Sequence, residues 1–174
     1  MKSDLEPLAV AANVTQAAFC RLDTVLLTFG FLIMQYQKMA TGGNHIASTA
    51  IIASLEKRWM AADQDIFIAT VIVNPFFRAV PFARHSRFVV SGIIILLESL
   101  YTRFFQERPP FSFSTELRDY LRAEGQYSAL HATCIRYAAF AEGQVRSTFT
   151  FIPIQKLKRT FRMTCQIHLM FTET

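Results

Sequence analysis

The chain has 174 residues, of which 52% are hydrophobic and 18% charged, so it can build a core and is not expected to be globally disordered. Its formal net charge of +5 permits an acidic partner such as nucleic acid. However, residues 145–174 hold five Lys and Arg residues and a single acid, Glu173, which together contribute +4. The preceding residues are close to neutral, which gives little support to a general DNA-binding face.

Cysteine usage and the apolar runs exclude two further classes of protein. Three cysteines, Cys20, Cys134 and Cys165, form neither an even set nor a CxxC pair, so reduced intracellular thiols are the simpler interpretation. The start of the chain is charged and does not resemble a signal peptide. The apolar runs are about ten residues or shorter, against roughly 20 for a membrane span. We therefore expect an intracellular protein with no membrane association.

The sequence pattern of the first part of the chain predicts α-helices. Apolar residues recur at steps of three and four over residues 4–38, which predicts one long helix that ends at Gly42-Gly43. Asn44 is a candidate cap for a helix over about residues 46–61, whose inward face would carry Ile51, Ile52, Leu55 and Trp59. A further helix is expected from Asp63 to Val73, although its β-branched residues also suit a strand.

The second half continues the helical pattern after a loop over residues 74–85 that Pro75 and Pro81 define. A helix over about residues 86–106 is apolar nearly all round, which predicts a central, fully buried position. Ser114 is the expected cap of a short helix that ends before Gly125. A last helix is expected over about residues 127–142, with Gly143 as its stop. The fold class is therefore all-α, an irregular helical bundle.

Catalytic chemistry has weak candidates. Metal-dependent nuclease chemistry needs carboxylates that converge on Mg²⁺, and Asp63 and Asp65 diverge on a helix. Glu98 ends an apolar run and is a candidate buried acid, but a water-facing or Arg-paired acid is the simpler interpretation. His131 and Cys134, at i and i+3, are half of a zinc site. We expect an ordinary half-buried pair and predict no cofactor, no metal and no enzyme activity.

The loop after residue 74 interleaves aromatic and basic side chains. Phe76 and Phe77 precede Arg78, and Arg84 and Arg87 follow Pro81. Such a surface can stack on bases and neutralise phosphates, so Arg78, Arg84 and Arg87 are the candidate nucleic-acid contacts. A solvated loop with its Phe residues tucked under the bundle is the alternative.

Residues 5–142 resemble hAT-family (Ac/hobo-like) transposases, in the form found in transposon-derived fungal reading frames. The positions that carry the resemblance most specifically are Leu55, Glu56, Lys57, Arg58, Trp59, Asp63, Asp65, Asn74 and Pro75. The resemblance implies helices from the insertion of an RNase H-like domain, a nuclear location, and a family that cuts DNA with an Asp-Asp-Glu triad. The strands that bear this triad and the family's zinc finger are not found in the sequence.

The resemblance therefore predicts a catalytically incomplete transposase fragment. It would at most mediate association with related transposase chains, through exposed apolar helices, or weak DNA contact. The alternative is a helical protein–protein interaction module unrelated to transposition. We expect residues 1–143 to form the bundle and residues 144–174 to be an atypical basic tail, partly β, disordered or out of frame. The codons for Phe149 to Ile154, read one nucleotide back, can spell family-like sequence.

Overall fold

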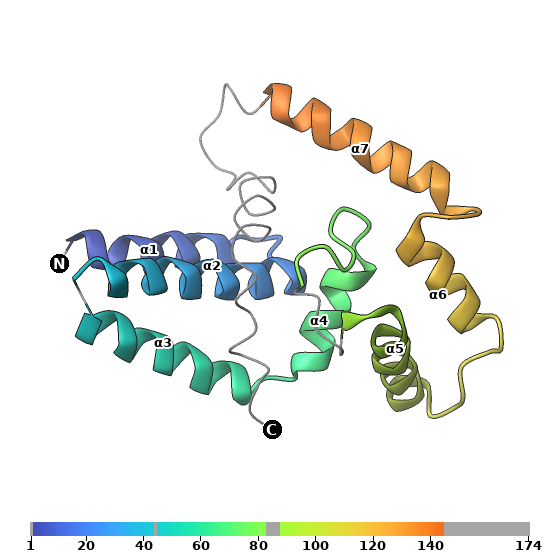
Figure 1. Ribbon diagram of the computed structural model, residues 1–174, viewed down its shortest axis with the longest axis horizontal. Helices are drawn as coiled ribbons and strands as arrows, with labels where there is room; N and C mark the ends of the chain where they lie inside the picture. Colours follow the sequence, from blue (N-terminus) through green and yellow to red (C-terminus); the bar gives the residue numbers. More distant parts are fainter. Residues whose placement is uncertain (1, 44, 83–87, 145–174) are drawn as a thin grey trace. The chain divides into compact units, whose positions relative to one another are not determined.

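The computed structural model describes residues 2–43, 45–82 and 88–144, and Figure 1 shows the course of the chain. Within these ranges the regular structure consists of α-helices with no strand, which confirms the all-α prediction. The helices are α1 (Lys2–Thr15), α2 (Leu22–Thr41), α3 (His45–Met60), α4 (Gln64–Val73), α5 (Val90–Phe105), α6 (Phe113–Arg122) and α7 (Tyr127–Gln144). The predicted tail over residues 144–174 lies, from residue 145 on, outside the described residues.

The described residues divide into two compact units, one up to Val71 and one from Ile72 onward. The boundary falls near the end of α4. The one bundle expected over residues 1–143 stays a prediction.

The first unit begins with two helices where the sequence predicted one. α1 ends at Thr15, and α2 begins only at Leu22 and packs against both α1 and α3 (Figure 1). The Tyr36 hydroxyl donates a 2.7 Å hydrogen bond to the Asp4 carbonyl, across 32 residues of sequence. The long helix over residues 4–38 was therefore wrong, because folding back lets the two apolar faces bury one another. A straight helix would have left both faces in need of other cover.

The core of the first unit gathers side chains from three helices. Ala11 of α1, Leu32, Ile33 and Tyr36 of α2, and Leu55 of α3 form one buried cluster. Trp59 is also buried, with its ring centroid 6.3 Å from that of Phe29 and 6.0 Å from that of Phe67. The helix predicted over residues 46–61 is confirmed by α3. The predicted cap, Asn44, lies outside the described residues.

The segment with strand-like composition is helical, as predicted. α4 begins at Gln64, directly after Asp63, and ends at Val73. Ile68, Ala69, Val71 and Ile72 are buried. The turn that follows is fixed by Asn74, whose Oδ1 accepts a 3.0 Å hydrogen bond from the Phe76 amide. The loop predicted over residues 74–85 is confirmed over its described part, residues 74–82.

The helix expected to be buried on every side is buried on one side only. In α5 the buried residues are Ile93, Leu96, Leu97 and Leu100, which recur at steps of three and four. Ile95 is 67% exposed and Val89, directly before the helix, is 47% exposed. The prediction that this helix is buried on every side was therefore wrong, because among the described residues only one face of α5 is covered. An apolar composition does not fix how many neighbours pack around a helix.

Two helix ends in the second unit also differ from the prediction. Ser112, not Ser114, is the residue before α6; Ser114 lies inside the helix and its hydroxyl donates a 2.6 Å hydrogen bond to Glu98 Oε1. α7 continues through Gly143 to Gln144, so that glycine does not end it. A hydroxyl can bond a carboxylate from another helix as well as its own backbone, and local sequence does not distinguish the two.

None of the described helices is long and apolar enough to cross a membrane.

Candidate functional site

In the second unit, Arg78 makes polar side-chain contacts with residues far from it in the sequence. This residue lies in the turn after α4 and has a positive φ of 49°. Its amide donates a 2.8 Å hydrogen bond to the Asn74 carbonyl. A non-glycine residue in the left-handed region costs on the order of 1 kcal/mol. The turn therefore holds Arg78 in an unfavourable backbone conformation, which its side-chain contacts must offset.

The guanidinium group of Arg78 lies at the C-terminal end of α6. Its Nη1 donates to the carbonyls of Tyr120 and Leu121, at 3.4 and 3.5 Å. These carbonyls belong to the last turn, where the helix dipole presents its negative end. The same turn ends in a left-handed residue, Ala123, with φ 59°. A cation from a distant turn thus takes the place that a local basic side chain often fills.

The same guanidinium group contacts α7. Arg78 Nη2 is hydrogen-bonded to His131 Nδ1, and it lies 3.4 Å from His131 Nε2. Because a guanidinium group only donates, the imidazole nitrogen that it contacts is the acceptor of this hydrogen bond. One turn further along α7, Cys134 is buried. Arg78 therefore connects the turn after α4 to both α6 and α7.

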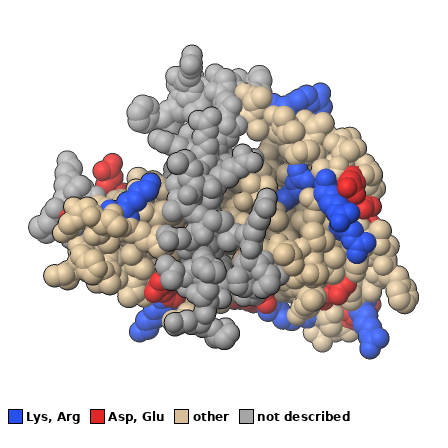
Figure 2. Space-filling model, viewed as in Figure 1, with Lys and Arg blue, Asp and Glu red and all other residues tan. Residues whose placement is uncertain are grey.

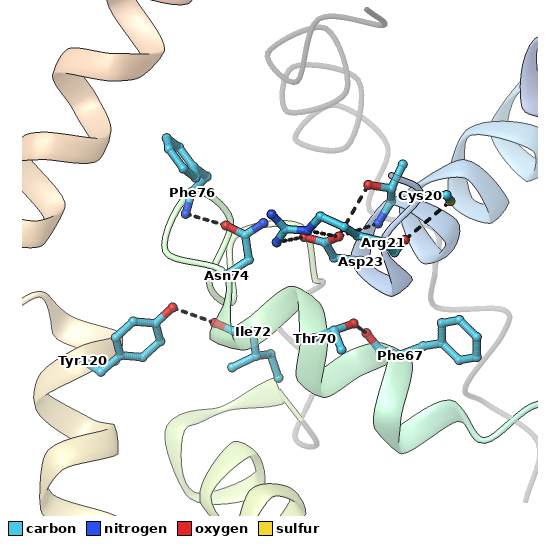
Figure 3. Close-up of polar contacts among 10 residues, drawn as sticks. Cys20, Arg21, Asp23, Phe67, Thr70, Ile72, Asn74, Phe76 and Tyr120 are labelled. Carbon is cyan, nitrogen blue, oxygen red and sulfur yellow. Dashed lines mark hydrogen bonds and ion pairs between the residues drawn. The ribbon is translucent and has the colours of Figure 1, made fainter. Parts of the chain in front are cut away.

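Tyr120 is the second connecting residue. Its hydroxyl donates a 3.1 Å hydrogen bond to the Ile72 carbonyl, as Figure 3 shows, and its ring meets Tyr127 edge-on at 5.5 Å. Burial raises the pKa of Tyr120 to about 12, an effect that the nearby Arg78 charge opposes and Cys134 and Tyr127 reinforce. The phenol is therefore protonated at neutral pH and acts as a hydrogen-bond donor rather than as a nucleophile or base.

The pair His131 and Cys134 does not extend to a metal centre in this part of the molecule. No group of three His, Cys, Asp or Glu side chains that could hold a metal ion occurs among the described residues. The His131 ring instead contacts the Arg78 guanidinium group. The arrangement suits structural attachment of α7 better than metal coordination.

Asp23 and the candidate carboxylates Asp63, Asp65 and Glu98 each have their own structural partner or position. Asp23 is buried and forms a forked ion pair with Arg21, with a 2.8 Å contact from Nη2 to Oδ2, and accepts the Thr24 amide at 2.8 Å (Figure 3). Asp63 precedes α4 and Asp65 lies in its first turn. Glu98 accepts a hydrogen bond from Ser114, a partner that the sequence analysis did not predict.

The family-like positions divide into buried and exposed sets. Leu55 and Trp59 are core residues of the first unit, and Asn74 is buried in the turn after α4. Glu56 and Pro75 are partly exposed. Lys57 and Arg58 are exposed.

The three candidate nucleic-acid contacts are not equally placed. Arg84 and Arg87 lie outside the described residues. The Arg78 side chain is occupied by α6 and α7, so a phosphate would have to compete with two carbonyls and an imidazole. On the face drawn in Figure 2, the visible Lys and Arg side chains stand in separate groups, some beside Asp or Glu. Nucleic-acid contact by these three residues stays a prediction.

Sequence reasoning missed the role of Tyr120 and the inward use of Arg78. Arg78 and the carbonyls it contacts are 42 and 43 residues apart, and Tyr120 is 48 residues from Ile72. No local spacing rule connects such positions. The one available signal was the change from helix to a proline-bounded turn, where a cation can reach a helix end.

No family model, curated protein or solved structure matches this chain.

Proposed function

We propose that this chain is a non-catalytic helical part of an hAT-like transposase, and that its role is to associate with related transposase chains. The observation that carries the association is the number of large apolar side chains that the described helices and their connections leave in water. Phe19, Ile46, Phe104, Phe105 and Phe111 are each more than 60% exposed. Exposed apolar surface of this kind is typical of interaction sites.

The transposase assignment is supported by the sequence pattern from Leu55 to Pro75. The proposal gives no catalytic residue to this chain, because the candidate carboxylates among the described residues have separate structural partners or positions. DNA contact is a secondary part of the proposal. It rests on Arg84 and Arg87 and on the basic residues after residue 144.

The association is tested by immobilising the full chain and measuring binding of an intact hAT-type transposase in a sensor assay. Saturable binding is expected. An unrelated helical protein of similar charge serves as the control. Equal binding of the two proteins, or no binding of either, would contradict the proposal.

The alternative is a helical protein–protein interaction module unrelated to transposition, which the same exposed side chains support. The flanking DNA distinguishes the two. Terminal inverted repeats, or neighbouring frames that encode the strands of a transposase nuclease, favour the transposase origin. Flanks without either favour the unrelated module.

A further inference from the structure

The connection between α5 and α6 carries an unusual concentration of exposed aromatic rings. Phe104 and Phe105, the last residues of α5, are 62% and 64% exposed. Phe111, which follows Pro109 and Pro110 just before α6, is fully exposed at 107%. We call Phe104, Phe105 and Phe111 the aromatic end of the α5–α6 pair, whose connection is visible in Figure 1.

These exposed rings stand beside an ordered group. Phe105 packs against Tyr101, with 4.6 Å between ring centroids, and Tyr101 also meets Phe113 of α6 at 5.6 Å. α5 and α6 pack against each other directly. Because this contact holds the Phe105 ring, that ring loses little freedom on binding, which lowers the entropic cost of association.

The area available is that of a modest interface. A phenylalanine ring can bury roughly 150–250 Å², so full cover of the aromatic end would remove on the order of 400–500 Å² of apolar surface. A standard stable interface buries about 800 Å² on each partner. The aromatic end therefore supplies about half of one side, and neighbouring polar residues must supply the rest.

The polar residues beside the rings favour a second copy of this chain as the partner. Glu107 and Arg108, adjacent in the connection, are both exposed and opposite in charge. One Glu107 oxygen accepts a 3.2 Å hydrogen bond from the Tyr101 hydroxyl, which leaves the carboxylate further acceptor sites. Across a two-fold axis, each Glu107 can face the second copy's Arg108, as a self-complementary interface requires. Arg103 adds a further cation, because its guanidinium carbon lies 5.1 Å from the centroid of the Phe104 ring. The three charges sum to only +1, which gives a polyanion little electrostatic attraction.

We propose that the aromatic end of α5–α6, with Glu107 and Arg108 at its rim, is a self-association surface that pairs two copies of this chain about a two-fold axis. This inference rests on the proposed association function and names its surface and partner.

The test uses the full chain in sedimentation velocity over the micromolar range. We expect a reversible monomer–dimer equilibrium, the monomer having a mass of 19.8 kDa. Phe105→Ser and Phe111→Ser should each raise the dissociation constant about tenfold or more, as loss of a central aromatic anchor does. Tyr137→Ser, on α7, is the matched control because Tyr137 is an aromatic residue that is 64% exposed and lies outside the aromatic end. It should leave the constant unchanged.

Charge reversal tests the two-fold pairing without removing a ring. Glu107→Arg alone and Arg108→Glu alone should each weaken dimerisation, because like charges then face one another across the axis. A mixture of the two variants should restore it, since one chain presents two positive side chains and the other two negative ones. Circular dichroism of each variant checks that the helices are retained.

The possible outcomes distinguish a failure of the proposed α5–α6 surface from a failure of the proposed association function. A dimer that the Phe105 and Phe111 substitutions leave intact overturns the surface but leaves the association function standing. A wild-type chain that stays monomeric overturns self-association, and the separate binding assay with an intact transposase then decides the function. Binding of a single-stranded oligonucleotide that is lost in Phe111→Ser, with no dimer present, would assign the rings to nucleic acid and overturn the proposal.

Discussion

Replacing Arg78 separates the strain of its backbone from the contribution of its side chain. Arg78→Ala removes two carbonyl contacts at 3.4 and 3.5 Å and the contact with His131, while keeping a Cβ at φ 49°. Arg78→Gly removes the same contacts but relieves the left-handed strain. The expected order of stability is wild type first, then Arg78→Gly, then Arg78→Ala.

The magnitudes follow from the geometry. Hydrogen bonds from a charged donor contribute about 1.5–3 kcal/mol when short. The carbonyl contacts are long and the side chain is partly exposed, so we expect about 1 kcal/mol from them together. The helix-end charge adds about 0.3–1 kcal/mol and the imidazole contact about 1 kcal/mol. Arg78→Ala should therefore cost about 2–3 kcal/mol, and Arg78→Gly should cost about 1 kcal/mol less.

Urea denaturation followed by circular dichroism measures these differences as shifts in midpoint at a constant slope. Arg136→Ala is the matched control, because Arg136 is exposed on α7 and its contact, with Thr133, lies within the same helix. It should change stability by less than about 0.5 kcal/mol. If Arg78→Ala is as stable as the wild type, the side-chain contacts contribute nothing. If Arg78→Ala is as stable as Arg78→Gly, the left-handed backbone conformation assigned to residue 78 is wrong.

Three further predictions concern other contacts. Leu55→Ala should destabilise the first unit by about 2–5 kcal/mol through cavity formation. The fluorescence of Trp59, the single tryptophan of the chain, should report this as an earlier unfolding transition, and an unchanged midpoint would contradict the core assignment. Folding raises the pKa of Tyr120 from 10.0 to about 12. The protonated phenol therefore stabilises the folded state fully below pH 10, and this stabilisation is lost as the pH rises toward 12. In melting curves recorded at increasing pH, the melting temperature of Tyr120→Phe should fall less between pH 10 and 12 than that of the wild type. An equally steep fall would contradict the prediction. Ser114→Ala should cost about 1–2 kcal/mol by removing the 2.6 Å donor to Glu98. In a double-mutant cycle with Glu98→Gln, additive effects would show that the two side chains do not interact.

Helical identity was predictable where periodicity and a start signal agreed. The segment after Asp63 shows this, because a strand-like composition was outweighed by the acidic first turn, and α4 is helical. The break between α1 and α2 was not predictable in the same way. Residues 16–21 include no glycine or proline, and the chain turns there because folding back buries Tyr36 and Ala11 together. That gain depends on contacts between helices, which a pattern within one helix does not contain.

The candidate site was predictable only in its parts. The sequence analysis selected Arg78 for its charge in a proline-bounded turn, and His131 for its spacing from Cys134. Neither feature indicated that the two side chains would meet, because they are 53 residues apart and belong to different elements. A charge in a loop carries no local sign of whether it faces a phosphate or a helix end. The three-dimensional course of the chain decides this.

The buried residues of the family-like stretch give little evidence about function, because packing in the core is enough to explain them. Leu55 and Trp59 are apolar residues four positions apart on α3, and packing in the core of the first unit explains both. Any amphipathic helix with the same neighbours would favour such residues, so they specify a fold rather than a transposase. Lys57 and Arg58 are exposed, and packing gives no reason for their charge. The family proposal therefore depends more on the exposed residues of this stretch than on its conspicuous tryptophan.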